Sequence, residues 1–420
     1  MIVSALAVSC TDDELVKGGD KYEVVPDIPV ALSLKIKVAD QMEVQTRLAQ
    51  SDETERTVNK LFVIAFKPSK QSDGAENADA SDDEWSVDNS AFYDTEDGLG
   101  NPIEVGKPQS VEFSMTTGLR RIYVVGNPQS GVGTLSDDEL KNVKTIAALK
   151  ALYSKLSDNL SVERVYFLMT GQAITKEKSE IVTVYKSGDH QGAIREDYTM
   201  ALNHVDARIT FNIIPAVGVT FEPEAYRVIN IPGGTYLFSR EKQNSGDNTW
   251  DYDGAGYAPS NRLSDFTEKD GKSIFEFYIC ENRQNPKQKI STESLLEEGT
   301  YYALREKQEK KLITGTVEGQ KYENGEYVYA NAKSTYVELE GTITYKDDDG
   351  SEVYAKTTYT IHLGNTGNSN TADWLNDLEL VNNYDTERNT HYTYNVKVQS
   401  VDQILSLIHI SEPTRRVVIS

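Results

Sequence analysis

Apolar and polar residues alternate along much of the chain with a period of two, which is typical of strands that bury one face. In 31–38 the buried face is expected to consist of Leu32, Leu34, Ile36 and Val38. The segments 204–213 and 391–398 alternate in the same way, and Asp-Gly at 349–350 has the chemistry of a hairpin turn between two further runs. A continuous apolar run over 61–66 predicts a strand that is buried on both faces. The chain is therefore predicted to be rich in β-strands.

One segment has the helical period instead. Ser136 and Glu139 form a capping-box pattern, in which each side chain accepts a hydrogen bond from the backbone N–H of the other residue. Apolar residues then recur every three or four positions, at Ile146, Leu149, Leu152 and Leu156. The sequence predicts a short helical insertion at this point.

The segment 71–100 is strongly acidic. It holds ten Asp and Glu and no Lys or Arg, with many small polar residues between them. This composition favours a solvated segment that buries little surface. We therefore expect a mobile acidic insertion between two strands, with a variable recognition loop as the functional alternative.

Length and charge limit the classes of protein that remain. The chain has 420 residues, with 66 Asp+Glu against 43 Lys+Arg and a formal net charge of −23. A single core stops growing at roughly 250–300 residues, so more than one domain is expected. The alternation of 204–213 ends at Pro215, and a domain boundary is predicted after it. The negative charge argues against nucleic acid as a partner, because phosphate binding needs clustered Lys and Arg.

No catalytic or metal-binding constellation stands out in the sequence. Two Cys residues are too few for a disulfide-dense scaffold or a Cys-rich zinc module. The glycine-containing segment 126–134 has Val132 where a phosphate loop has Lys. Cys280 has no neighbouring His or basic cluster that would lower its pKa, so a buried thiol is expected rather than a nucleophile. Three histidines fall on the polar faces of predicted strands, where we expect solvent exposure: His204, His362 and His391. The sequence thus predicts a protein that is not an enzyme and has no cofactor and no metal.

Both ends of the chain differ in character from the rest. Small residues before Cys10 resemble a bacterial lipobox, which predicts a signal peptide and leader over 1–26 and lipidation of Cys10. The alternative is an incidental Cys in a disordered end. At the other end, 405–420 resembles the translation of a sequencing-library adapter. We expect this segment to be an artefact and leave it out of the fold prediction.

Several stretches, in order along the chain, resemble the fimbrillins, the subunits of Bacteroidetes type V pili. A first strand over 30–38 is followed by Thr-Arg at 46–47 and by a second strand over 58–66, in the order of that family. Further similar segments are 121–127, 167–171, 202–211, 277–283 and 387–392. The last of these, Glu-Arg-Asn-Thr-His-Tyr, is the most specific.

The resemblance implies a mainly β fold with two tandem transthyretin-like β-sandwich domains. They would span 27–217, including the acidic insertion 71–100, and 218–404. It also implies a lipoprotein at the cell outer membrane that serves adhesion as a fimbrium (pilus) subunit. Its partners would be other pilus subunits, a processing protease, and host or bacterial surface ligands.

Fimbrillins assemble by donor-strand exchange, in which a protease removes the first strand and a terminal strand of another subunit fills the groove. By this resemblance the leaving strand would carry Leu32, Leu34, Ile36 and Val38. Cleavage would follow Arg47, with Arg56 as the second choice. The alternative function is a monomeric surface glycan-binding lipoprotein, in which some of the 24 Tyr residues would form stacking platforms.

Overall fold

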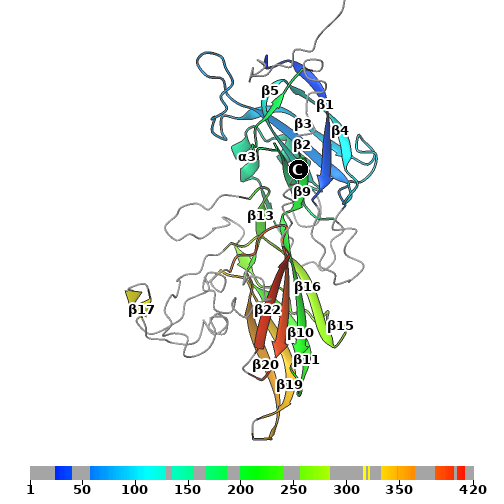
Figure 1. The fold of residues 1–420 in the computed structure, drawn as a ribbon, viewed down its shortest axis with the longest axis vertical. Coiled ribbons are helices and arrows are strands. Elements are labelled where there is room, and N and C mark those ends of the chain that lie inside the picture. The colour runs from blue at the N-terminus through cyan, green and yellow to red at the C-terminus, as the bar shows by residue number, and fades with distance from the viewer. Residues whose placement is uncertain are drawn as a thin grey trace, which may run out of the picture.

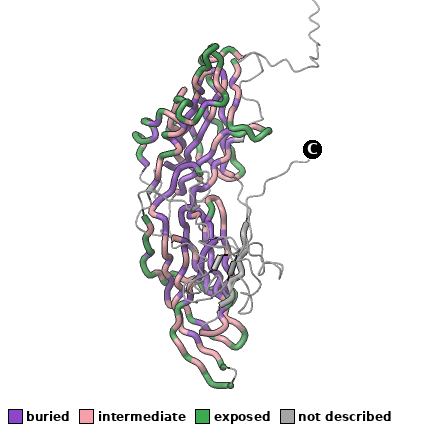
Figure 2. Tube along the Cα trace, turned by 90° about the vertical axis from the view of Figure 1, so that its left-hand side faces the viewer, coloured by how far each residue is buried: buried purple, intermediate pink, exposed green. Residues whose placement is uncertain are grey.

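The structure is a computed structural model, and it is mainly β, as expected (Figure 1). It describes residues 24–39, 57–128, 135–155, 166–186, 199–239, 256–283, 316–317, 320–321, 333–347, 349–364, 384–401 and 404–411. The strands gather into two units stacked along the long axis of the molecule (Figure 1). Buried residues run through the interior of both units, and exposed residues lie along the outside and at both ends (Figure 2).

The N-terminal unit is built on one eight-stranded sheet with the order β3-β2-β5-β7-β9-β1-β4, in which β8 also pairs with β5. Its strands are β1 (Pro29–Val38), β2 (Lys60–Lys67), β3 (Ser86–Asp94), β4 (Gln109–Thr116), β5 (Gly118–Gly126), β7 (Met169–Ile174), β8 (Val182–Val184) and β9 (Thr199–His204). Buried side chains of β1 and β4 share one core with those of β2 and β5, although these pairs lie near opposite ends of the strand order. The sheet therefore curves until its two ends enclose a common interior.

The continuous apolar run at 61–66 is buried on both faces because β2 has a different core on each side. Leu61, Val63 and Ala65 face the core shared with β1, whereas Phe62, Ile64 and Phe66 pack in a second cluster with Trp85 and the helices. The helices are α2 (Asp137–Lys141) and α3 (Ile146–Ala151). The prediction of a doubly buried strand is confirmed.

The C-terminal unit consists of two sheets with one core between them. The five-stranded sheet has the order β15-β16-β10-β21-β22, and the three-stranded sheet has the order β11-β19-β20. Their strands are β10 (Asp206–Pro215), β11 (Val219–Ile229), β15 (Thr267–Lys269), β16 (Lys272–Cys280), β19 (Tyr336–Lys346), β20 (Glu352–His362), β21 (His391–Val398) and β22 (Ile404–Ser411). Stacked aromatic rings fill the centre, with Phe211 against Phe275 at 4.8 Å and against Tyr394 at 4.7 Å between centroids. The predicted hairpin at 349–350 is confirmed, because it joins β19 to β20.

Short strands complete the described part of the chain. They are the pairs β6 (Tyr153–Lys155) with β13 (Gly234–Tyr236), β12 (Ile231–Pro232) with β14 (Tyr257–Ala258), and β17 (Thr316–Val317) with β18 (Gln320–Lys321). The β6–β13 pair ties the helical part of the N-terminal unit to the start of the C-terminal unit. Arg388 strengthens this junction, because its guanidinium binds the Glu281 carboxylate at 2.8 Å and donates to the Leu237 carbonyl at 2.9 Å.

The junction between the units differs from the expectation. β10 was expected to close the first domain, but it pairs with β16 and β21 in the five-stranded sheet. The preceding strand, β9, pairs with β1 and β7 in the N-terminal sheet. The chain therefore changes sheets at Val205 rather than after Pro215. Alternation reports which face of a strand is buried, and it carries no information on the partner strand.

The predicted mobile insertion at 71–100 is wrong for the residues that form β3. This strand pairs with β2 along its length, and Trp85, which precedes it, is fully buried. Some of the acidic residues that composition assigns to solvent have basic partners: the Asp82 carboxylate, for example, lies 2.8 Å from Arg121 and 2.9 Å from Lys150. The counter-charges come from outside the segment, so a count within 71–100 does not detect them.

The helical prediction is confirmed in part. Ser136 and Glu139 form the expected capping box at the start of α2. The single helix expected through Leu156 is instead two short helices, because Thr145 caps a new helix, α3, with its side chain. Leu152 is already extended and leads into β6.

Two of the three strand histidines are buried, contrary to expectation. His204 is 5% exposed and packs edge-on against Phe167, and His362 is 2% exposed and packs against Tyr336 and Tyr384. Aromatic side chains therefore pack against both imidazole rings. Cys280 is a fully buried thiol, as predicted.

Several predictions concern the ends of the chain. Cys10 and the rest of the leader lie outside the described residues. β22 covers part of 405–420 and pairs antiparallel with β21, and the adapter origin of that segment stays a prediction. In the described part of the chain, no helix has the length and apolar character needed to cross a membrane.

Candidate functional site

The first strand is the candidate functional element, and its two faces differ sharply. The four inward residues of β1 are between 0% and 4% exposed, and they are Leu32, Leu34, Ile36 and Val38. The residues between them, including Ser33 and Lys35, are exposed or half-buried. The alternating sequence therefore produces a strand with one apolar face and one hydrated face.

Most of the ladder of β1 runs to a single neighbour. It pairs antiparallel with β4 over eight residues, from Pro29 opposite Thr116 to Ile36 opposite Gln109. On its other side only Ile36, Lys37 and Val38 pair with β9, in parallel. Most of β1 thus has no ladder partner on that side, so relatively few backbone hydrogen bonds hold it to the rest of the sheet.

The apolar face of β1 lies on a groove lined by other strands of the same sheet. The lining includes Val63 on β2, Phe113 on β4 and Val124 on β5, all buried in one cluster with the β1 side chains. Each buried Leu or Ile contributes about 1.5–3 kcal/mol by leaving water. Removal of β1 would expose this lining, so the groove favours an occupant with the same alternating apolar pattern.

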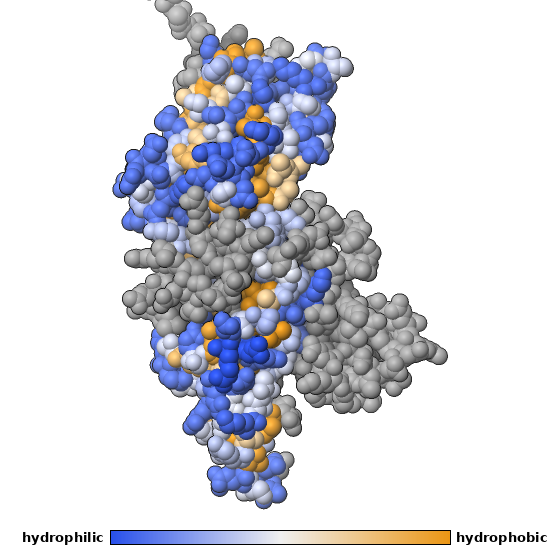
Figure 3. Space-filling view, turned by 180° about the vertical axis from the view of Figure 1, so that it is seen from behind, coloured by the Kyte–Doolittle hydropathy of each residue, from blue (hydrophilic) through white to orange (hydrophobic). Residues whose placement is uncertain are grey.

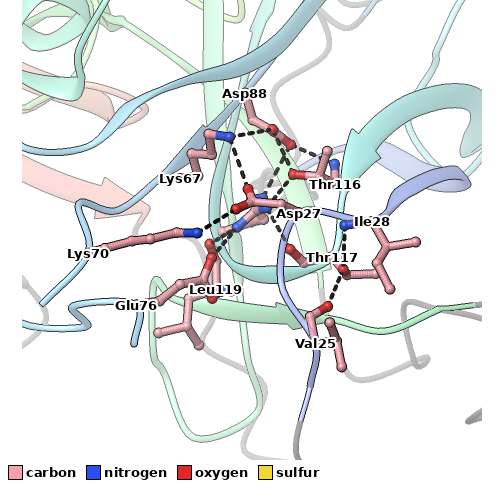
Figure 4. A network of polar contacts seen from close by, with 11 residues as sticks. Val25, Asp27, Ile28, Lys67, Lys70, Glu76, Asp88, Thr116, Thr117 and Leu119 are labelled. Carbon is pink, nitrogen blue, oxygen red and sulfur yellow. Dashed lines mark hydrogen bonds and ion pairs between the residues drawn. The ribbon is translucent and has the colours of Figure 1, made fainter. Parts of the chain in front are cut away.

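A polar network fixes the chain where it enters the groove (Figure 4). The backbone N–H of Asp27 donates to the Thr117 carbonyl at 3.0 Å, and the Thr117 N–H donates to the Ile28 carbonyl at 2.9 Å. The Thr117 hydroxyl accepts from the Ile28 N–H at 3.0 Å and donates to the Val25 carbonyl at 2.6 Å. Thr117 is 1% exposed. It therefore sets the register of β1 from a buried position.

The Asp27 side chain adds charge to this network. Its carboxylate lies 2.8 Å from the Lys70 ammonium and 3.0 Å from the Lys67 ammonium. Hydrogen bonds from Lys70 and Lys67 lower the pKa of Asp27 to about 2. Asp27 is therefore ionised throughout the physiological range of pH.

A buried arginine supports the same end of the groove from beneath. The Arg120 side chain is fully buried, 2.9 Å from Glu76 and 3.2 Å from Asp88, and it donates to the Thr117 carbonyl at 2.6 Å. Asp88 in turn accepts from the Thr116 N–H at 2.7 Å. Because every charge in this cluster has an opposite charge beside it, its burial is compensated.

The far edge of β4 is held by side chains of β3. The Asn89 amide donates to the Ser114 carbonyl at 2.7 Å, and the Tyr93 hydroxyl donates to the Glu112 carbonyl at 2.7 Å. If β1 left, β4 would lose its ladder partner and these contacts would still tie it to the sheet. The acidic segment 71–100 thus supplies the strand that keeps the groove wall in place.

The structure brings together the four residues predicted for the leaving strand on one buried face. The predicted cleavage residues Arg47 and Arg56 lie outside the described residues, between β1 and Val58. Asp27, Lys67, Lys70 and Thr117 were not singled out from the sequence. Asp27 carries no pattern of its own, and its partners are distant in sequence.

Other kinds of site find little support in the described residues. No group of three or more His, Cys, Asp or Glu residues that could hold a metal ion occurs among them. The large hydrophobic residues exposed in the described part are Val25, Ile174, Val217 and Tyr354. They are scattered along the chain, and in Figure 3 apolar residues form small areas among hydrophilic ones. Tyr354 is the tyrosine among these four exposed residues.

Comparison with known proteins identifies one family. Residues 30–208 match the family model described as the major fimbrial subunit protein (FimA). This match confirms the resemblance to the fimbrillins over that part of the chain. It covers β1 from its second residue through the N-terminal sheet. No curated protein matches the sequence.

Comparison with solved structures finds similar chains at low sequence identity, among them the following three. The tip fimbrial protein Mfa3 from Porphyromonas gingivalis is 13% identical, with a TM-score of 0.49, 92% of this chain covered and 100% of that chain. A protein from Bacteroides eggerthii described as a candidate cell adhesion protein is 13% identical, with a TM-score of 0.44 and coverage of 93% and 98%. The fimbrial anchor protein Mfa2 from P. gingivalis is 11% identical, with a TM-score of 0.35 and coverage of 91% and 97%.

Proposed function

From the match of residues 30–208 to the major fimbrial subunit family, we propose that this protein is a structural, non-enzymatic fimbrial subunit that assembles by exchange of its first strand. The observation that supports exchange most strongly is the pairing of β1, which buries a complete apolar face and forms most of its ladder with β4. Another strand with the same alternation could take its place by β-augmentation.

Cleavage after Arg47 would start the exchange. It would cut the connection between β1 and β2, so that β1 would be held only by its ladder, its apolar face and the network at Asp27. Arg56 is the second candidate for the cut. Both lie in polar sequence between two strands, where a protease needs access. The same cut would separate the subunit from a lipid anchor at Cys10.

In this proposal the uncut protein is an outer-membrane lipoprotein at the cell surface. After the cut, the groove would accept a strand from another pilus subunit, and the assembled fimbria would serve adhesion to host or bacterial surface ligands. The partners are therefore a processing protease and other subunits of the same family.

The proposal is tested with an arginine-specific protease and the purified chain. Mass spectrometry locates the first cut, and size-exclusion chromatography with light scattering follows the assembly state. We expect a first cut after residue 47, its loss in Arg47→Gln, and no change in Arg56→Gln. If the first cut in the unaltered protein and in Arg56→Gln does not follow residue 47, the assignment of Arg47 is contradicted. A cut protein that keeps its N-terminal fragment indefinitely contradicts strand exchange.

The alternative of a monomeric glycan-binding lipoprotein has no specific observation in its favour among the described residues. It predicts saturable glycan binding by the uncut monomer on a glycan array. The fimbrial proposal predicts that added carbohydrate does not change the melting temperature of the uncut monomer.

A further inference from the structure

The end of the β1 groove is lined by cations as well as by apolar side chains. Lys67 lies at the last position of β2, and Lys70 follows three residues later, where it forms a β-bridge with Glu76. Both ammonium groups point at the Asp27 carboxylate, just outside the apolar part of the groove (Figure 4). Asp27 belongs to the segment that would leave with β1, whereas both lysines belong to the sheet that would remain.

The charges of the cluster balance only while Asp27 is present. Its cations are Lys67, Lys70 and Arg120, and its carboxylates are Asp27, Glu76 and Asp88. Arg120 already has both Glu76 and Asp88 beside it, and Lys67 is 4.0 Å from Asp88. Departure of β1 would leave three cations facing two carboxylates. The vacated place would therefore attract another negative group.

We propose that Lys67 and Lys70 form a carboxylate-binding site at the end of the groove, which retains and selects strands with an acidic residue at the position of Asp27. The inference rests on the proposed strand exchange. An occupant of the groove would then need an acidic residue at this position in addition to the alternating apolar residues.

The position of the acidic residue is fixed by backbone bonds. Hydrogen bonds in both directions between residues 27–28 and Thr117 set the register of the entering chain. In that register the carboxylate meets the lysines five residues before the first buried side chain, Leu32. An acidic residue one position away would not share the turn conformation of Asp27, whose φ is 66°, so its side chain would take another direction. The site therefore reads both the charge of the occupant and its spacing from the apolar run.

The test uses the full chain, cut with the arginine-specific protease, and two labelled synthetic peptides that act as occupants. Both peptides comprise residues 24–39, and one of them carries Asp27→Asn. Fluorescence anisotropy measures the release of each bound peptide at low salt. We expect the Asn peptide to leave roughly twofold to thirtyfold faster, the range that two half-exposed ion pairs provide. The difference should shrink at about 1 M salt, where the Debye length is about 3 Å.

Variants of the groove show whether the lysines are responsible. In Lys67→Met/Lys70→Met protein the two peptides should leave at the same rate. The matched control is Asp137→Asn, because Asp137 forms a comparable ion pair with Lys60 at the opposite end of β2, at 2.8 Å. This control should keep the full difference between the peptides. Equal release of both peptides from the unaltered protein at low salt overturns the carboxylate site and leaves strand exchange standing.

A second measurement does not depend on cleavage. Hydrogen exchange in the uncut chain reports the opening of the Ile28 and Thr117 amides. These should exchange faster in Asp27→Asn by a similar factor and remain unchanged in Asp137→Asn. If neither peptide enters the cut protein while these amides respond as expected, strand exchange is contradicted and the carboxylate site stands. Unchanged amides in Asp27→Asn overturn the site.

Discussion

Truncation of Leu34 to alanine gives the sharpest prediction for the groove. Leu34 is 2% exposed, lies opposite Val111 in the ladder with β4, and packs in the core shared with β2 and β5. Replacing a buried leucine by alanine costs about 2–5 kcal/mol, since apolar contacts are lost and a cavity remains. The change introduces no polar group and leaves the backbone ladder intact, so the cost falls on the apolar face alone.

In the uncut chain this cost appears as a lower free energy of unfolding of the N-terminal unit. In the cut protein it becomes weaker retention of β1. Since every 1.4 kcal/mol corresponds to a factor of ten, release should accelerate about 30-fold to several thousandfold. Alanine at position 34 is still apolar, so the alternation of apolar and polar residues along β1 is kept. The strand should therefore leave faster without changing its register.

The assay follows a fluorophore at the N-terminus of the cut protein by size-exclusion chromatography over time. The matched control is Lys35→Ala, the next residue along β1, whose side chain is exposed and whose ladder partner is Ser110. The control should release its fragment at nearly the rate of the unaltered protein. If Leu34→Ala and Lys35→Ala release their fragments equally fast, the apolar face of β1 does not control retention and the reasoning is refuted.

Three further predictions concern the surroundings of the groove. Lys70 and Lys67 hold the pKa of Asp27 at about 2, below its ordinary 3.8, so the stabilisation by Asp27 should be complete above pH 4 and be lost as the pH falls through 2. The difference in melting temperature between the unaltered protein and Asp27→Asn should follow that course, and a difference that changes between pH 5 and 8 would contradict it. Tyr93→Phe removes the hydroxyl that donates to the Glu112 carbonyl and should slow peptide uptake by the cut protein about twofold to tenfold, as loss of one hydrogen bond implies; unchanged uptake would show that β3 does not hold the groove wall. Arg388→Met leaves the buried Glu281 with less compensation and should lower the free energy of unfolding by about 1–3 kcal/mol in urea titration, whereas a neutral effect would show that this ion pair does not stabilise the junction.

The sequence predicted those elements whose burial is decided within one strand. Alternation at 31–38 located the four buried residues of β1, and the continuous run at 61–66 located a strand with a core on each side. The capping box at Ser136 and the turn at 349–350 were likewise local signals. In each case short-range chemistry and tertiary packing favour the same structure.

The remaining features depend on partners that are distant along the chain. The segment 71–100 looked solvated because the basic partners of its Asp82, Arg121 and Lys150, lie outside it. His204 lies on a polar strand face but packs against Phe167, and the sequence of its strand gives no sign of that contact. β10 alternates equally well in either sheet.

The candidate site was predictable in its apolar part only. The charged part joins Asp27 to lysines some forty residues away. Neither residue type is unusual at its position, and no spacing rule connects them. Only the curvature of the sheet, which brings the end of β2 beside the start of β1, creates the site.

Native mass spectrometry of the chain before and after cleavage after Arg47 tests the central claim most directly. The measurement reports whether the N-terminal fragment that contains β1 stays with the body of the protein, and whether added peptide 24–39 replaces it. Strand exchange predicts that the uncut chain takes up no peptide, and that the cut chain loses its fragment and gains one peptide in its place. A cut chain that keeps its fragment and excludes the peptide would contradict the account.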